Sequence, residues 1–164
     1  MGRDGFSLIE LLAVMGIMAI LLGLATLNFN NWIRRSNIEK EVKELYSDMM
    51  YVRQQALVTG LSHEVQFASA SRIVFRRYSS EHDAVGTVVR SRDLPYAITI
   101  SAPSETELTF NSRGMLVETT PKSVCVFSKC EPPLDSIYIT QSRINMGKII
   151  NQGAPCAQAN ITLK

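Results

Sequence analysis

The sequence predicts an α+β fold in which one long N-terminal helix packs on a C-terminal antiparallel β domain. Two observations carry this prediction. Apolar residues dominate positions 6–29 and recur at helical spacing over positions 30–60, whereas short β-rich runs separated by turn residues fill positions 61–164. The chain has 164 residues, so beside an apolar segment there is room for one compact domain.

The segment 6–29, which reads FSLIELLAVMGIMAILLGLATLNF, is predicted to be the membrane-embedded half of the helix. It carries a single formal charge, and about 24 residues rising 1.5 Å each would cross a hydrocarbon core of roughly 30 Å. A secretory signal fits poorly, because its apolar region would be shorter and would end at a small-residue cleavage site. We therefore expect the segment to be retained.

Glu10 is the one charge in this segment, and it is expected to have a cationic partner. An ionised carboxylate costs at least about 2.5 kcal/mol inside a membrane helix, so such residues usually have a function. Cleavage after Gly5 would create an α-amine on Phe6, four residues before Glu10 and on the same helix face. A carboxylate there also favours a helix N-terminus. The amine could belong to the same chain or to a neighbour.

The start of the chain closely resembles the type IV prepilin motif, in the residues Gly5-Phe6-Ser7-Leu8-Ile9-Glu10-Leu11-Leu12. The resemblance implies that residues 1–5 are a leader, that prepilin peptidase cuts between Gly5 and Phe6, and that Phe6 becomes N-methylated. It also implies that Glu10 compensates the N-terminal charge of an adjacent subunit when residues 6–29 enter a filament core.

The resemblance also supplies the orientation. It implies a cytoplasmic leader, a single pass through the inner membrane and a periplasmic domain that joins a filament after assembly. Charge counting points the other way, because Arg34 and Arg35 follow the segment whereas only Arg3 and the amino terminus precede it. The implied partners are prepilin peptidase, other major and minor pilins or pseudopilins, and an inner-membrane assembly platform.

Residues 30–60 are predicted to be the amphipathic half of the same helix. Apolar residues recur there with a 4-3-4-3-4 spacing, charged residues take the other faces, and Gly60 is a natural stop. The pattern is too short for a sustained coiled coil, so the stripe is expected to pack on the chain's own sheet. The stripe consists of Ile38, Val42, Leu45, Met49, Val52 and Ala56.

Residues 61–164 are predicted to form an antiparallel β domain. Breakers separate the β-rich runs at a spacing that suits hairpins better than parallel crossovers. The expected strands are Ser62–Phe67, Arg72–Tyr78, Gly86–Arg92, Ala97–Ser101, Glu107–Asn111, Ser123–Phe127, Ile137–Gln141 and Arg143–Ile149.

Two further segments are similar to the GspH/FimT family. The end of the helix, from Leu45-Tyr46-Ser47-Asp48 to Gly60, resembles the end of that family's first helix, and Leu108-Thr109-Phe110-Asn111-Ser112-Arg113-Gly114 resembles its central strand and turn. This implies a minor pseudopilin of type II secretion or a minor type IV pilin. DNA-binding members resembling FimT carry a GRxR motif toward the C-terminus, where this chain reads Ser142-Arg143-Ile144-Asn145.

Three cysteines permit one disulfide in an oxidising compartment, although their spacing does not determine the pair. The preferred pair is Cys130–Cys156, because both residues lie near proline-bearing loops. Cys125 lies in a β-branched run, where a buried thiol packs readily. Cys125–Cys130 is the alternative pair.

Arg72, Arg76 and Arg77 belong to the densest basic group, with Arg90 and Arg92. A solvated strand edge is the preferred interpretation, and a surface that captures DNA or another extracellular ligand is the alternative. A net charge of +2 does not by itself indicate nucleic acid. No phosphate loop, nucleophile elbow or metal-ligand spacing is apparent, so we expect no enzyme, cofactor or metal.

Overall fold

A long N-terminal helix dominates the computed structural model, which describes residues 7–80, 83, 85–102 and 106–164, with the backbone alone for residues 24–28. Helix α1 spans Leu8–Thr59 and has 52 residues, which corresponds to about 78 Å. Gly60 ends it in the left-handed conformation with φ 66°, where its N–H donates to the carbonyl of Ala56. The single long helix predicted from the sequence is confirmed. Phe6, its expected first residue, lies outside the described residues.

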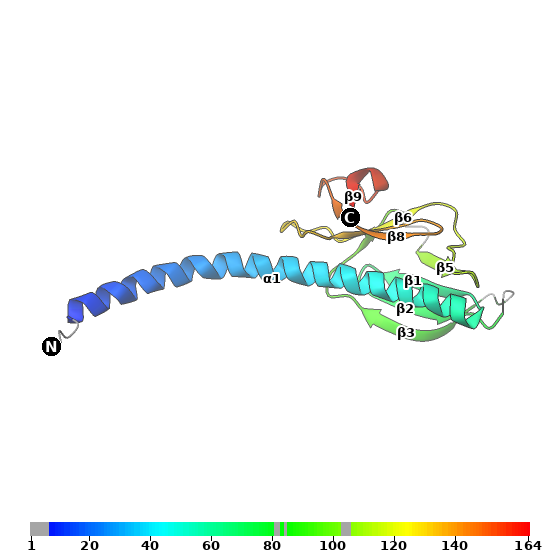
Figure 1. Cartoon of the computed structure of the whole chain (residues 1–164), viewed down its shortest axis with the longest axis horizontal. Helices are drawn as coiled ribbons and strands as arrows, with labels where there is room; N and C mark the ends of the chain where they lie inside the picture. Colours follow the sequence, from blue (N-terminus) through cyan, green and yellow to red (C-terminus); the bar gives the residue numbers. More distant parts are fainter. Residues whose placement is uncertain (1–6, 81–82, 84, 103–105) are drawn as a thin grey trace.

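Two antiparallel sheets lie beside the C-terminal half of α1 (Figure 1). The first sheet has the strand order β3-β2-β1-β5, and the second has the order β4-β6-β7-β8-β9. A short 3₁₀ helix, η1, spans Gln158–Asn160. The strands are β1 His63–Ser69, β2 Arg72–Arg77, β3 Thr87–Asp93, β4 Thr99–Ile100, β5 Glu107–Phe110, β6 Lys122–Cys125, β7 Ser136–Ile139, β8 Ile144–Ile149 and β9 Ile161–Leu163.

Each of the eight expected strands overlaps one observed strand, so the antiparallel β domain is confirmed. Strand β9 was not expected, because three residues are too few for an alternating pattern to stand out. The division into two sheets was not expected either, because it depends on pairings between strands far apart in the sequence, such as β1 with β5.

The predicted stripe of α1 forms the centre of the core, and each of its six residues is at most 4% exposed. The stripe joins one hydrophobic cluster with residues of both sheets, which confirms that it packs on the chain's own domain. The sheet residues in this cluster include Val65, Phe67, Ile73, Phe75, Leu108 and Phe110 of the first sheet and Ile137, Ile139 and Ile144 of the second.

The turn after β5 lies against the last part of α1. Asn111 shapes this turn, because its Oδ1 accepts hydrogen bonds from the backbone N–H groups of Arg113 at 3.0 Å and Met115 at 3.1 Å. Gly114 has φ 67°, and a Cβ there would lie 2.7 Å from Cγ of Leu57. A glycine is therefore required where the turn meets the helix.

Candidate functional site

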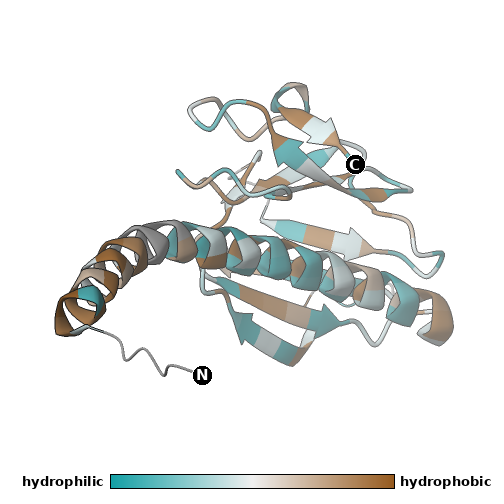
Figure 2. Cartoon of the chain, turned by 60° about the vertical axis from the view of Figure 1, so that its left-hand side comes forward, coloured by the Kyte–Doolittle hydropathy of each residue, from teal (hydrophilic) through white to brown (hydrophobic). Residues whose placement is uncertain are grey.

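The first half of α1 extends beyond the domain (Figure 1). The large apolar side chains described there are exposed. Figure 2 shows this protruding end coloured mostly as hydrophobic. A helix that is apolar on all sides needs an apolar environment around it. More than half of each of the following side chains is exposed: Leu8, Ile9, Leu11, Leu12, Met15, Ile17, Met18, Ile20, Leu21 and Leu22.

Across the residues that the structure fully describes, no helix is both long enough and apolar enough to cross a membrane. The predicted membrane segment 6–29 falls partly outside this description, since residue 6 and the side chains of residues 24–28 are not described.

Glu10 lies in the first turn of α1 and is exposed. Its backbone N–H donates to the carbonyl of Ser7 at 3.0 Å, so the carboxylate sits where the helix dipole is positive. No ion pair involves Glu10 within the described part of the chain. Gly5 and Phe6, the predicted cleavage site, lie outside that part. The end of the helix therefore offers a carboxylate within an otherwise apolar surface.

Within the domain, salt bridges join α1 to β3, the edge strand of the first sheet. Arg90 of β3 contacts Asp48 at 3.4 Å. Burial raises the pKa of both Glu41 and Asp48 above the ordinary values, although the charge of Arg92 acts in the opposite direction. Arg92 meets three carboxylates of the helix: Glu41 at 2.6 Å, Asp48 at 3.0 Å and Glu44 at 3.3 Å.

The three arginines predicted as an alternative ligand surface do not form a free basic patch. Arg72 lies 3.8 Å from Asp93, and Arg76 lies 3.9 Å from the buried carboxylate of Glu64. Arg77 is exposed and forms no ion pair with a described residue. Two of the three positive charges are thus opposed by nearby carboxylates.

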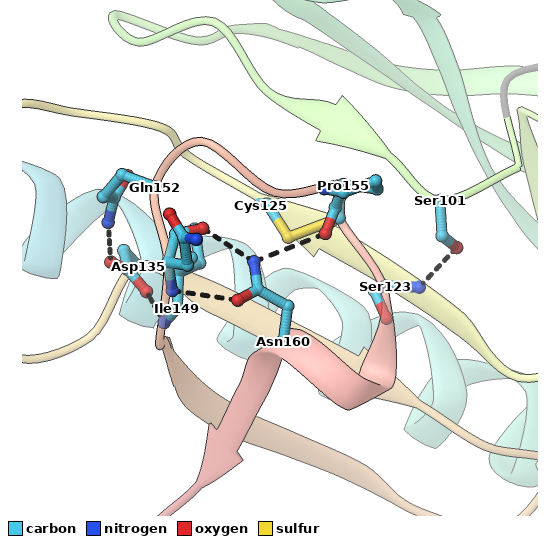
Figure 3. The surroundings of a disulfide bond; sticks show 10 residues. Ser101, Ser123, Cys125, Asp135, Ile149, Gln152, Pro155 and Asn160 are labelled. Carbon is cyan, nitrogen blue, oxygen red and sulfur yellow. Dashed lines mark hydrogen bonds between the residues drawn. A yellow bond between two sulfur atoms is a disulfide. The ribbon is translucent and has the colours of Figure 1, made fainter.

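The predicted disulfide pairing is wrong. The structure joins Cys125 to Cys156, with a Cα–Cα separation of 5.9 Å (Figure 3). Cys130 is left as a buried free thiol. Cys125 ends β6, and the segment between β8 and β9 brings Cys156 to it from 31 residues away. The Cys130 sulfur instead lies 3.3 Å from Oγ of Ser128. Cys125 is buried, as expected, but as a member of the disulfide rather than as a free thiol.

A buried carboxylate supports the same region beside the disulfide (Figure 3). Asp135 is 0% exposed and accepts hydrogen bonds from the backbone N–H of Ile149 at 2.6 Å and from Nε2 of Gln152 at 2.9 Å. Burial raises its pKa, although these hydrogen bonds and Lys148 act against that effect. Asp135 thereby fastens the loop after β8 to the loop before β7. No three His, Cys, Asp or Glu residues group as metal ligands in the described chain.

Comparisons with known proteins agree with these observations. Residues 1–26 match the model of the prokaryotic N-terminal methylation motif, which implies processing by a prepilin peptidase and anchoring in a membrane. The matched motif thus overlaps the start of α1, the long helix that carries the two-sheet β domain. No curated protein matches the chain significantly.

Two solved structures show a similar fold. The type IV minor pilin FimU of Pseudomonas aeruginosa is 18% identical, and the match covers 76% of this chain and 96% of FimU with a TM-score of 0.53. The minor pseudopilin EpsH of the Vibrio cholerae type II secretion system is 10% identical, and the match covers 68% of this chain and 96% of EpsH with a TM-score of 0.50. This fold agrees with the GspH/FimT-like resemblance read from the sequence.

Proposed function

We propose that the chain is a minor subunit of a type IV pilus or of a type II secretion pseudopilus, and that it assembles through the protruding half of α1. The observation that carries the proposal is the exposure of apolar side chains on all sides of residues 8–22. Such a surface is stable in lipid before assembly and among the helices of other subunits afterwards. Neither environment is supplied by the chain's own domain.

The processing step gives Glu10 its partner. After cleavage between Gly5 and Phe6, the methylated amine of Phe6 lies four residues before Glu10, within reach of its own or a neighbour's carboxylate. Moving the carboxylate of Glu10 out of water is costly unless a cation pairs with it. The helix is therefore most stable in the filament at the axial position where Glu10 meets the amine of Phe6. The apolar residues of the helix contribute packing that does not favour one axial position over another.

The domain is proposed to be periplasmic, with residues 6–29 in the inner membrane before assembly. The Cys125–Cys156 disulfide supports this location, because disulfides persist in oxidising compartments. The partners are prepilin peptidase, other major and minor subunits and an inner-membrane assembly platform. Of the two solved structures, one is a pilus subunit and the other a secretion subunit, so the proposal stays at the level that they share.

The test follows the N-terminus of the chain during co-expression with a prepilin peptidase. Mass spectrometry is expected to find the chain without residues 1–5 and with one added methyl group on Phe6. The Gly5→Leu variant provides the control, because a bulky side chain at the cleavage site should leave the leader attached. An intact wild-type leader, while a known prepilin in the same cells is cut, would contradict the proposal.

A second variant separates processing from assembly. Glu10→Val is expected to be cleaved and inserted like the wild type, because it makes the helix more apolar. It should, however, be depleted from filaments isolated from cells that express the cognate assembly system. Normal incorporation of Glu10→Val would show that the carboxylate has no role in assembly.

A further inference from the structure

A second group of cations lies where the protruding part of α1 meets the second-sheet side of the domain, and it differs from the arginines of the first sheet. Its members come from α1, from the loop after β6, from the end of β8 and from the C-terminal residue. Figure 1 shows the loop after β6 and the C-terminus at the end of the domain from which the helix protrudes. We call this group the collar, and it consists of Arg34, Arg35, Lys129, Lys148 and Lys164.

Two adjoining hollows bring the collar residues together. One, of about 660 Å³, is lined by Arg34 and Lys129, and the other, of about 530 Å³, by Arg35, Lys148 and Lys164. The side chain of Glu131 borders both hollows and so connects them into one surface.

Positive charge outweighs negative charge in the collar, although Lys148 lies within electrostatic range of the buried carboxylate of Asp135. Two carboxylates line the hollows, those of Glu39 and Glu131, and Glu39 is engaged with Lys43 at 2.7 Å. In the described part of the chain, no collar residue forms an ion pair. Arg35 does donate a hydrogen bond to the carbonyl of Cys130, which joins α1 to the loop. Anions that approach this surface would therefore meet at least Arg34, Lys129 and Lys164, whose side chains form no ion pair with a described residue.

Aromatic residues mark the same level of the helix. Trp32 is 64% exposed, borders the second hollow and stacks on Phe29 with ring centroids 6.0 Å apart. Phe127 borders the first hollow. Tryptophan is enriched where a membrane helix leaves the hydrocarbon and enters the headgroup region. Trp32, Arg34 and Arg35 closely follow the apolar segment, and the collar lysines line the same hollows as the two arginines. The collar would therefore lie at the headgroup depth when the segment is in a membrane.

We infer that the collar binds the phosphate headgroups of anionic phospholipids in the outer leaflet of the inner membrane. The inference rests on the proposed function, because it needs the apolar segment to be inserted. It also explains why two arginines follow the segment against the usual charge bias. Clustered cations beside a membrane helix bind anionic lipid, and this attraction weakens with salt. The collar thus holds the domain close to the membrane until the subunit is extracted into a filament.

The experiment uses the full chain in vesicles and exploits Trp32, which is the single tryptophan of the sequence. Energy transfer from Trp32 to dansyl-labelled phosphatidylglycerol is compared with transfer to dansyl-labelled phosphatidylcholine, at the same trace level in phosphatidylcholine vesicles. Greater transfer to the anionic lipid is expected at low salt, and this preference should fade as salt is added. Equal transfer to both lipids at low salt overturns the inference.

Two triple variants with the same loss of charge locate the effect. Arg34→Gln/Lys129→Gln/Lys164→Gln removes three exposed collar cations, and it should reduce the preference by about fivefold per charge at low salt. Arg77→Gln/Arg113→Gln/Arg143→Gln removes three exposed cations outside the collar and should keep the preference. An equal loss in both variants overturns a specific collar site.

Two further outcomes distinguish failure of this inference from failure of the proposed function, and distinguish lipid from a neighbouring subunit as the partner of the collar. Flotation of the wild-type chain with pure phosphatidylcholine vesicles reports insertion alone, so failure to float overturns both proposals, whereas flotation without lipid preference overturns only the collar. If the collar variant keeps its lipid preference but is lost from filaments, the collar binds an acidic surface of a neighbouring subunit, and the lipid inference is wrong.

Discussion

The two halves of α1 belong to one continuous helix and yet depend on different surroundings. Leu45 in the domain half is 2% exposed, whereas Leu12 in the protruding half is 60% exposed. The domain half has an apolar stripe and polar flanks, and the protruding half is apolar on every side. Both halves are helical, but the chain's own domain stabilises the domain half, whereas other molecules must stabilise the protruding half.

The largest expected effect tests this difference with the same substitution in each half. Leu45→Ala should lower the free energy of unfolding by about 2–5 kcal/mol, because it leaves a cavity between α1 and the sheets. Leu12→Ala should change it by at most about 0.5 kcal/mol, because no residue of the domain covers that side chain. Urea unfolding of the full chain in detergent, followed by near-ultraviolet circular dichroism, measures both. Similar losses in the two variants would contradict the comparison.

The next effect concerns the second sheet alone. Replacing both cysteines of the disulfide, Cys125→Ser with Cys156→Ser, should lower the free energy of unfolding by about 2–4 kcal/mol, because the closed loop constrains the unfolded chain. Insertion of the protruding half into vesicles should remain unchanged. The same urea titration and a flotation assay make the two measurements.

Cys130→Ser is the matched control for this prediction, because it changes a buried cysteine that is not in the disulfide. It should cost less than the double variant. If Cys130→Ser is the more damaging change, or if non-reducing peptide mapping finds Cys130 in the disulfide, the observed pairing is not the one that stabilises the domain.

Much of the fold was predictable because its signals are local. The stripe from Ile38 to Ala56 shows its period within one helix, and the strands are bounded by turn residues that lie beside them in the sequence. The prepilin-like start was also recognisable locally, because Gly5, Phe6 and Glu10 are separated by fixed short distances. Such patterns need no knowledge of what lies across the core.

The remaining features could not be predicted because they depend on contacts between distant segments. Arg92 meets Glu41, which lies 51 residues earlier, so a basic group in the sequence becomes a network of salt bridges. The collar shows the reverse, because Arg34 and Lys129 are far apart in the sequence and come together in one hollow. The disulfide was mispredicted for the same reason.

The smallest expected effect concerns pH and Asp135, within the half of the molecule that supports itself. Burial raises the pKa of Asp135 in the fold above its ordinary value of 3.8, so the folded state binds a proton at a pH where the unfolded chain does not. Stability from this group is therefore fully present below about pH 3.8 and falls as pH rises through the folded pKa.

Asp135→Asn removes this titration. The free energy of unfolding of the wild type, minus that of the variant, should therefore increase as the pH falls from 7 to about 4. Urea titrations of both proteins at several pH values measure the difference, and contributions from Glu41 and Asp48 cancel because both proteins retain them. A difference that is constant or that decreases toward acid would mean that the buried carboxylate is stabilised in its ionised form, by the N–H of Ile149 and by Gln152, more strongly than burial opposes it.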